Sequence, residues 1–171
     1  MKTEDLVEAC RRAAREPQAA LAVKDVLEQA VREGVADLPE TDELTLQVLG
    51  CDPDLTVLQV VVPSGPRWSL PHDHRMWAAI AVCDGREDNE FFRRSTPAIE
   101  SSGGRSVETG QVLLLGDDVI HRIHNPLSRP LRAVHVYGGD FPAAHRSMWT
   151  EPGWREEPYD PVRATGTVIR T

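Results

Sequence analysis

Residues 65–85 read GPRWSLPHDHRMWAAIAVCDG and join two closely spaced histidines to an apolar, strand-like run. Side chains two positions apart on a β-strand point to the same face of the sheet, so His72 and His74 can converge on one point. Imidazole is a common nitrogen ligand for Fe, Zn, Ni and Cu, whereas an isolated histidine in a strand is more often a core or surface residue. The stretch therefore predicts a β-protein and raises the hypothesis of a metal-binding pair.

From about residue 41 onward, the rest of the chain shows the same strand-like pattern. Short segments rich in Val, Ile and Leu alternate with turn signals, and no helical pattern intervenes. Strands and turns at such spacing indicate an antiparallel barrel or sandwich. The expected strands lie in ELTLQVLG, LTVLQVVVP, WAAIAVCDG, NEFFRR, QVLLLG, VIHRIHN and LRAVHVYGG, and the expected turns in CDPD, PSGP, CDGRED, SSGG, LGDD, NPLSRP and GGDF.

The N-terminal part has a different, helical pattern. Residues 3–33 carry apolar side chains at roughly helical spacing. Thr3 is suited to cap a first helix, Pro17 to start a second and Gly34 to end it. We expect a helical hairpin that packs on the β-structure.

Length and composition favour one domain with two parts. The 171 residues are enough for a substantial core, and 40% of them are apolar. An N-terminal helical segment (1–40) is expected to pack on a barrel that continues into a C-terminal tail (41–171). Within that tail, the four prolines of residues 142–171 predict an irregular wrap over an edge or an opening.

Charge and cysteine usage narrow the function classes. The formal net charge of -8 and the lack of a basic run interleaved with aromatics argue against nucleic acid as a partner. No apolar run approaches the roughly 20 residues of a membrane span, and the first residues lack the apolar region of a signal peptide, so a cytoplasmic protein is expected. Three scattered cysteines without a CxxC argue against a disulfide framework and against a structural zinc site.

A metal held by two histidines needs a third ligand from elsewhere in the sheet. His121 opens HRIHN on a later expected strand and is the candidate. His124, three residues on, has the wrong strand parity to join it unless the strand bulges. His145 could line the mouth of a barrel or lie on the surface.

Two stretches resemble the paired motifs of the cupins. Residues 65–85 are similar to the first motif, with a glycine, a short gap, HxH and a closing glycine. Residues 110–125, GQVLLLGDDVIHRIHN, are similar to the second, in which a glycine is followed by a turn, a histidine and, last, an asparagine. The resemblance covers roughly residues 44–141. It implies a mainly β protein with a double-stranded β-helix (jelly-roll) barrel and a metal near its centre.

The resemblance implies a three-histidine site. The glutamate that the first cupin motif usually supplies would fall at Ala78 or Ala79, which cannot bind metal. The metal ligands are then His72, His74 and His121. Three neutral ligands leave a divalent cation with its full charge and with open positions, which favours an anionic substrate such as a thiolate or a carboxylate.

This pattern further resembles the thiol dioxygenases, namely cysteine dioxygenase and the 3-mercaptopropionate dioxygenases. PHDH with a following tryptophan and HVYGGDF on the last expected strand carry that resemblance. In that family a three-histidine Fe(II) converts a thiol and O2 to a sulfinate, beside a Ser-x-His-x-Tyr hydrogen-bond relay. The matching residues are Ala133, His135 and Tyr137, so His135 and Tyr137 are the expected catalytic pair.

The sequence departs from the thiol dioxygenase pattern at two places, one in the hydrogen-bond relay and one where the substrate carboxylate binds. Ala133 replaces the relay serine, and no arginine stands some 25 residues before His72, where the family binds the substrate carboxylate. Four other arginines are candidates for that role, although each is individually more typical of a surface residue. They are Arg67, Arg75, Arg93 and Arg122.

Several neighbours of the motifs have plain structural interpretations. Asp73 is expected to point outward, and Trp77 to be a pocket wall or core residue. Asn125 is expected to end a strand before Pro126. Cys83 is expected to be a buried core thiol.

The leading hypothesis is a non-haem Fe(II) dioxygenase of a small thiol or carboxylate-bearing substrate, with O2 as co-substrate. One alternative is a redox-inert cupin in which Zn, Ni or Mn serves lyase or isomerase chemistry, because three histidines and an open position suit zinc equally well. Another is a non-catalytic barrel that binds a small ligand.

Overall fold

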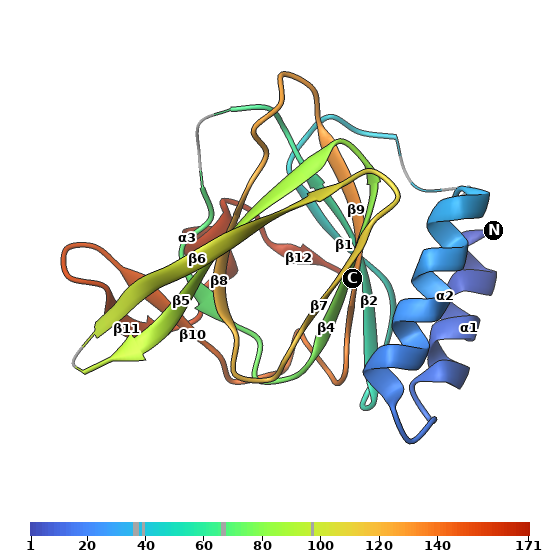
Figure 1. Ribbon diagram of the computed structural model, residues 1–171, viewed down its shortest axis with the longest axis horizontal. Helices are drawn as coiled ribbons and strands as arrows, with labels where there is room; N and C mark the ends of the chain where they lie inside the picture. Colours follow the sequence, from blue (N-terminus) through green and yellow to red (C-terminus); the bar gives the residue numbers. More distant parts are fainter. Residues whose placement is uncertain (36–37, 39, 66–67, 97) are drawn as a thin grey trace.

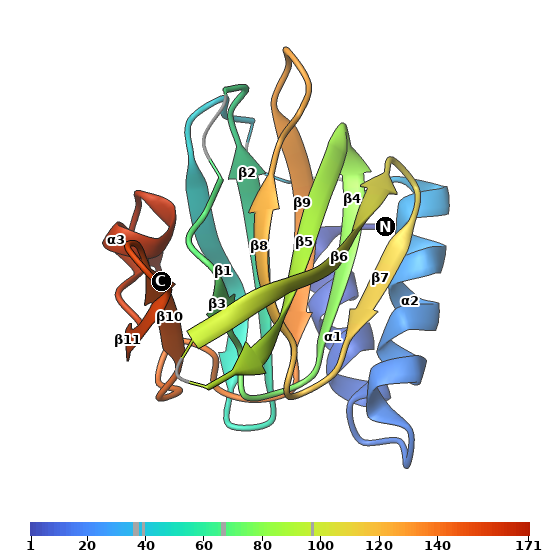
Figure 2. The same ribbon diagram turned by 60° about the vertical axis from the view of Figure 1, so that its left-hand side comes forward.

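The computed structural model describes residues 1–35, 38, 40–65, 68–96 and 98–171. Its strands form two six-stranded sheets, which face one another as the two walls of a barrel (Figures 1 and 2). The first sheet has the order β12-β1-β2-β9-β4-β7 and the second the order β11-β10-β3-β8-β5-β6. The strands are β1 (Thr45–Asp52), β2 (Leu55–Val62), β3 (His72–Asp73), β4 (Ala78–Asp84), β5 (Arg86–Ser95), β6 (Ala98–Glu108), β7 (Val112–Leu115), β8 (Ile120–His124), β9 (Leu131–Tyr137), β10 (Ser147–Thr150), β11 (Arg155–Pro158) and β12 (Ile169–Arg170).

The first sheet is buried on both faces, and its sequence reflects this. The side chains of β9 point alternately to the two faces of the sheet. Val134 and Val136 belong to the apolar cluster under the helices, and Ala133 and Tyr137 to the cluster between the sheets. A strand covered on both sides needs apolar residues at nearly every position. That requirement explains why six of the eight residues of β2, LTVLQVVV, are Leu or Val.

The N-terminal hairpin covers the outer face of that sheet, as predicted. Helices α1 (Thr3–Ala13) and α2 (Ala19–Glu33) lie against strands β1, β4 and β7 (Figure 1). Gly34 ends α2 with a φ of 79°, a conformation that favours glycine. Thr3 does not cap the first helix, because Lys2 occupies the N-cap position and Thr3 is already helical. Pro17 lies two residues before α2, whose N-cap is Gln18.

Two expected turns are instead parts of strands. SSGG lies inside β6, which pairs with β5 as a long hairpin. The glycines there serve a bulge and a close approach rather than a reversal, because a Cβ at Gly104 would lie 2.7 Å from the Asn89 carbonyl oxygen. The RED of CDGRED likewise begins β5, after a turn at Gly85 with a φ of 93°.

The C-terminal tail is more regular than an irregular wrap. Strand β10 pairs with β3 in the second sheet, and β12 pairs in parallel with β1 in the first. The short helix α3 (Pro161–Thr165) lies between them in the chain and is capped by Asp160. The tail therefore extends both sheets and brings its side chains to the open end of the barrel.

In the described part of the chain, no helix has both the length and the apolar character that crossing a lipid bilayer requires.

The packing of α2 on the sheet yields a stability prediction. Leu27 is fully buried under the hairpin, whereas Leu21 on the same helix is 49% exposed. Leu27→Ala should lower the free energy of unfolding by about 2–5 kcal/mol through lost burial and a cavity. Leu21→Ala should change it by less than about 0.5 kcal/mol. Urea denaturation followed by circular dichroism measures both, and equal losses for the two variants would contradict this packing.

Candidate metal centre

Three buried histidines meet between the sheets. Strand β3 pairs with β8 so that His72 stands directly opposite His121, and His74 follows two residues after His72. One ring nitrogen from each histidine lies within 4.8 Å of the others. The predicted convergence of the three side chains is therefore present, and no carboxylate or thiol of the described residues joins the group.

Hydrogen bonds orient two of the three rings. His72 Nδ1 donates to the Leu70 carbonyl oxygen at 2.9 Å, and His121 Nδ1 donates to Asn89 Oδ1 at 2.8 Å. With Nδ1 protonated, Nε2 of each ring carries the free lone pair. The orientation that a metal ligand needs is thus set by the protein itself.

The spacing of the nitrogens fits one metal ion. His121 Nε2 and His74 Nε2 are 3.1 Å apart. Two nitrogens bound at about 2.1 Å to one ion, at a right angle, lie roughly 3.0 Å from each other. His74 Nδ1 is buried and has no hydrogen-bond partner among the described residues, so this ring lacks the orienting hydrogen bond that His72 and His121 have. The donor set suits Fe, Zn, Ni, Cu or Mn and does not select among them.

Burial also holds the histidines in the form that binds metal. Desolvation lowers the pKa of His72 to about 4, with the Arg146 charge acting in the same direction. Burial, together with the neighbouring histidines, lowers the pKa of His74 and of His121 well below the ordinary value. All three rings are therefore neutral at pH 7, and metal binding releases no proton from them.

The expected catalytic pair lies next to this group. The Tyr137 ring meets the His74 ring edge-on at 5.0 Å between centroids, and Tyr137 Oη lies 3.2 Å from His135 Nδ1. Burial raises the pKa of Tyr137, so its phenol remains protonated at neutral pH. The pair shares one face of β9, as strand alternation predicts; its catalytic role stays a prediction.

The sequence analysis missed two polar residues on β5. Glu87 is fully buried, and its carboxylate contacts His135 Nε2 at 3.2 Å and accepts from Asn89 Nδ2 at 3.0 Å. Asn89 in turn binds His121, so one hydrogen-bonded path links Tyr137 to the three-histidine group. Glu87 and Asn89 are two positions apart and share the inner face of β5. The acidic run around them resembled a turn, which hid this alternation.

A second missed residue is an arginine of the tail. Arg146 is 6% exposed, and its guanidinium carbon lies 3.7 Å from the Phe141 ring centroid and 3.8 Å from that of Tyr159. Its Nε and Nη1 atoms are buried without a hydrogen-bond partner in the described chain. Leaving charged donors unpaired in the interior is costly, so this is the arrangement expected of a group that receives an anion.

Phe141 and Tyr159 also line a small chamber beside the histidines. Its volume is about 30 Å³. The walls combine polar side chains of the candidate site with aliphatic residues of β1, β2 and β8. They are Leu46, Leu58, Val60, Ser69, His72, His121, Ile123, His135, Tyr137, Phe141, Tyr159 and Thr165.

The arginines considered from the sequence are engaged elsewhere. Arg75 pairs with Asp73 at 2.7 Å, Arg93 with Glu100 and Arg122 with Glu90. Arg67 lies outside the described residues. Among the arginines that the structure describes, Arg146 is therefore the one that is buried beside the histidines.

Other neighbours of the motifs have structural roles. Asp73 is not a surface group, because it is 2% exposed and accepts from the Ser147 backbone N–H at 2.8 Å. His124 stacks on Trp68 and contacts the Gly65 carbonyl, outside the metal group. Asn125 bonds two backbone groups of the turn after β8, at Leu127 and Arg129, and donates to the Val62 carbonyl at the end of β2.

Trp77, His145 and Cys83 also lie outside the three-histidine group. Trp77 packs in the core under the helices, next to Gly138, and His145 is exposed. Cys83 packs against the cluster under the helices, where burial raises the pKa of its thiol to about 11.

Comparison with solved structures supports the fold. An RmlC-like cupin with a double-stranded β-helix fold from Methanocaldococcus jannaschii aligns with a TM-score of 0.51 and 14% identity, over 60% of this chain and 86% of the other. An uncharacterised protein with a double-stranded β-helix domain from Klebsiella pneumoniae aligns with a TM-score of 0.51 and 16% identity, over 69% and 87%. The protein has the cupin double-stranded β-helix fold, which confirms the predicted fold class.

These similarities concern the fold alone. A hydroquinone 1,2-dioxygenase, PnpCD, solved with Cd²⁺ and 4-hydroxybenzonitrile, aligns with a TM-score of only 0.46, at 17% identity over 57% of this chain and 66% of the other, too low to support an argument. No protein-family model matches the sequence.

The depressed histidine pKa values give a pH prediction. His72 takes up a proton near pH 6.5 when unfolded but only near pH 4 when folded, so its contribution to stability is present above pH 6.5 and is lost as pH falls towards 4. Without metal, the free energy of unfolding should fall by about 3 kcal/mol over that interval from this group. Denaturant melts at several pH values measure the loss. His72→Gln should flatten the profile, and an unchanged profile would contradict the assignment.

Proposed function

We propose that the protein is a metal-dependent dioxygenase that converts a small anionic thiol to a sulfinate, with Fe(II) as its metal. One observation carries the proposal. A buried three-histidine group without a carboxylate adjoins the Tyr137–His135 pair, and a buried arginine with unpaired donors packs against Phe141 and Tyr159, two walls of the adjoining chamber. The resemblance to thiol dioxygenases motivates the choice of reaction.

The reaction balances without a further reductant. A thiolate RS⁻ and O2 give RSO2⁻, so both oxygen atoms end on sulfur, which loses four electrons while O2 gains four. When bound to His72, His74 and His121, Fe(II) would supply the oxygen chemistry and adjacent open positions for the thiolate and O2. The protein supplies binding, orientation and a dry chamber.

Arg146 is the proposed binding group for the substrate anion. Two aromatic rings pack against the guanidinium, and its buried Nε and Nη1 atoms are left without a partner in the described chain. A guanidinium binds a carboxylate through two parallel hydrogen bonds. The arginine that the sequence lacks before His72 is thus replaced from the C-terminal tail.

Tyr137 and His135 are the proposed pair that steadies the reacting oxygen atoms. Glu87 receives the Nε2–H of His135, which directs Nδ1 at the phenol oxygen. Glu87 takes the outer place in the relay that Ala133 cannot fill. The phenol donates its O–H to His135 Nδ1, which fixes it at the chamber wall and leaves the phenol oxygen to accept a hydrogen bond from a protonated ligand atom.

Oxygen uptake by the iron-loaded protein tests this function. Cysteine and 3-mercaptopropionate should be consumed with one O2 per sulfinate, and cysteamine, which lacks the carboxylate, much more slowly. Arg146→Gln should raise KM for the carboxylate thiols about 10- to 100-fold through the lost charge-assisted bonds and should affect cysteamine little. Arg93→Gln, on the exposed face of β5, is the control.

Two results would count against this proposed function. Tightly bound zinc in protein purified without an affinity tag, with no oxygen uptake after iron reconstitution, would favour the redox-inert alternative. Equal losses for cysteamine and 3-mercaptopropionate in Arg146→Gln would remove the anion-binding role.

A further inference from the structure

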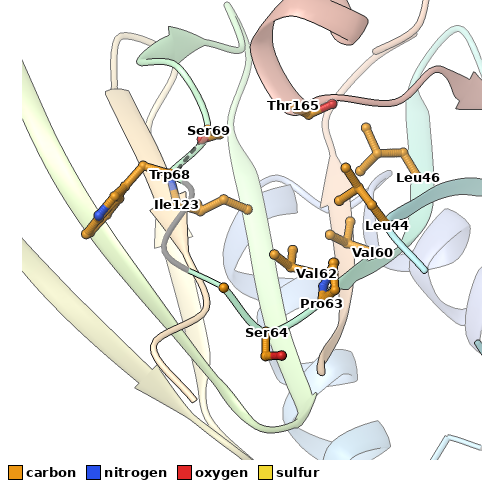
Figure 3. Close-up of a pocket in the computed structure, with 11 residues that line it drawn as sticks. Leu44, Leu46, Val60, Val62, Pro63, Ser64, Trp68, Ser69, Ile123 and Thr165 are labelled. Carbon is orange, nitrogen blue, oxygen red and sulfur yellow. Dashed lines mark hydrogen bonds between the residues drawn. The ribbon is translucent and has the colours of Figure 1, made fainter. Parts of the chain in front are cut away.

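A second cavity adjoins the metal chamber at the open end of the barrel. Its volume is about 110 Å³, and its walls come from β1, β2, β8, α3 and the segments that flank them. Ile123 faces Leu46, Val60 and Val62 across it (Figure 3). The full lining is Leu44, Leu46, Val60, Val62, Pro63, Ser64, Gly65, Trp68, Ser69, Ile123 and Thr165.

The cavity and the metal chamber share a wall. Both are lined by the same five residues, namely Leu46, Val60, Ser69, Ile123 and Thr165. At the other end of the cavity, Ser64 and Gly65 are exposed. The two cavities therefore lie side by side, and the larger one reaches exposed residues at its far end.

The lining offers an apolar surface and few free polar groups. Ser69 Oγ accepts from the Ile123 backbone N–H at 2.9 Å, and Thr165 Oγ1 donates to the Pro161 carbonyl at 2.8 Å. No charged side chain of the described residues lines the cavity. A polar substrate group placed here would lose its water without a matching partner, whereas an aliphatic group would gain from burial.

The volumes of the chamber and of the cavity indicate which part of a substrate each can hold. The chamber of about 30 Å³ has room for roughly two water molecules, since one needs about 10–15 Å³ of such volume, so it accommodates the metal-binding atoms of a substrate and not its carbon chain. An apolar cavity of roughly 150 Å³ can hold benzene, with six carbons, so about 110 Å³ suits roughly four carbons.

We infer that the cavity is a specificity site for an aliphatic tail of about four carbons on the substrate of the metal centre. The inference rests on the proposed function only for the identity of the metal-binding thiolate. The substrate class is then a small mercapto acid whose carbon chain lies in the cavity, while its sulfur and carboxylate face the histidines and Arg146.

A series of 2-mercapto acids bound to the zinc-loaded protein tests the tail site without relying on turnover. Mercaptoacetate, 2-mercaptobutanoate, 2-mercaptohexanoate and 2-mercaptooctanoate share one thiol and one carboxylate and differ in tail length. Titration calorimetry should show Kd falling roughly fourfold per added carbon up to the four-carbon tail, and changing little beyond it.

Cavity-filling variants separate this site from general hydrophobicity. Val62→Phe and Leu44→Phe each place a ring in the cavity from its half-buried rim and should abolish the gain with tail length, while mercaptoacetate binds as before. Leu21→Phe, on the far helix, is the matched control and should keep the gain. Either cavity variant suffices if the other does not fold.

The outcomes distinguish this inference from the proposed function. A flat Kd across the series, or a gain that persists in both cavity variants, would overturn the tail site even if the iron-loaded protein oxidises mercaptoacetate. A gain that the variants abolish supports the tail site even if no thiol supports oxygen uptake, in which case the dioxygenase proposal alone fails.

Discussion

The antiparallel pairing of β3 with β8 is the constraint on which the candidate site depends. It sets His72 directly opposite His121, and side chains opposite each other in such a pair have Cβ atoms roughly 5 Å apart. Strand β3 has only two residues, so this register is held by β10 on its other edge and by buried Asp73, which ties β3 to the start of β10. The C-terminal tail therefore supports the histidines as well as delivering Arg146.

Polar groups in the barrel are arranged as one connected network instead of separate pairs. Tyr137, His135, Glu87, Asn89 and His121 follow one another at hydrogen-bond distance. In a low-dielectric interior such a path polarises along its length, and each member fixes the orientation of the next. The network thus couples the orientation of His121 to that of the phenol.

Sequence pattern predicted the strands and the histidine group well because both depend on local periodicity. Two-residue alternation gives the shared face of His72 and His74, and a long apolar run marks a strand buried on both sides. What the sequence did not reveal depends on contacts between distant segments. Glu87 looks like part of a charged turn until β5 pairs with β8, and Arg146 looks like a surface residue until Phe141 and Tyr159 enclose it. Asp73 was misplaced for the same reason, since its partners come from β5 and the tail.

X-ray absorption spectroscopy of protein loaded with one equivalent of Fe(II) or Zn(II) tests whether His72, His74 and His121 hold one metal ion. We expect three imidazole nitrogens at about 2.0–2.1 Å from the ion. His74→Ala should lose one of them together with tight binding, and His124→Ala should leave the spectrum unchanged. A spectrum of the wild-type protein without imidazole ligands, or one that changes in His124→Ala and not in His74→Ala, would contradict it.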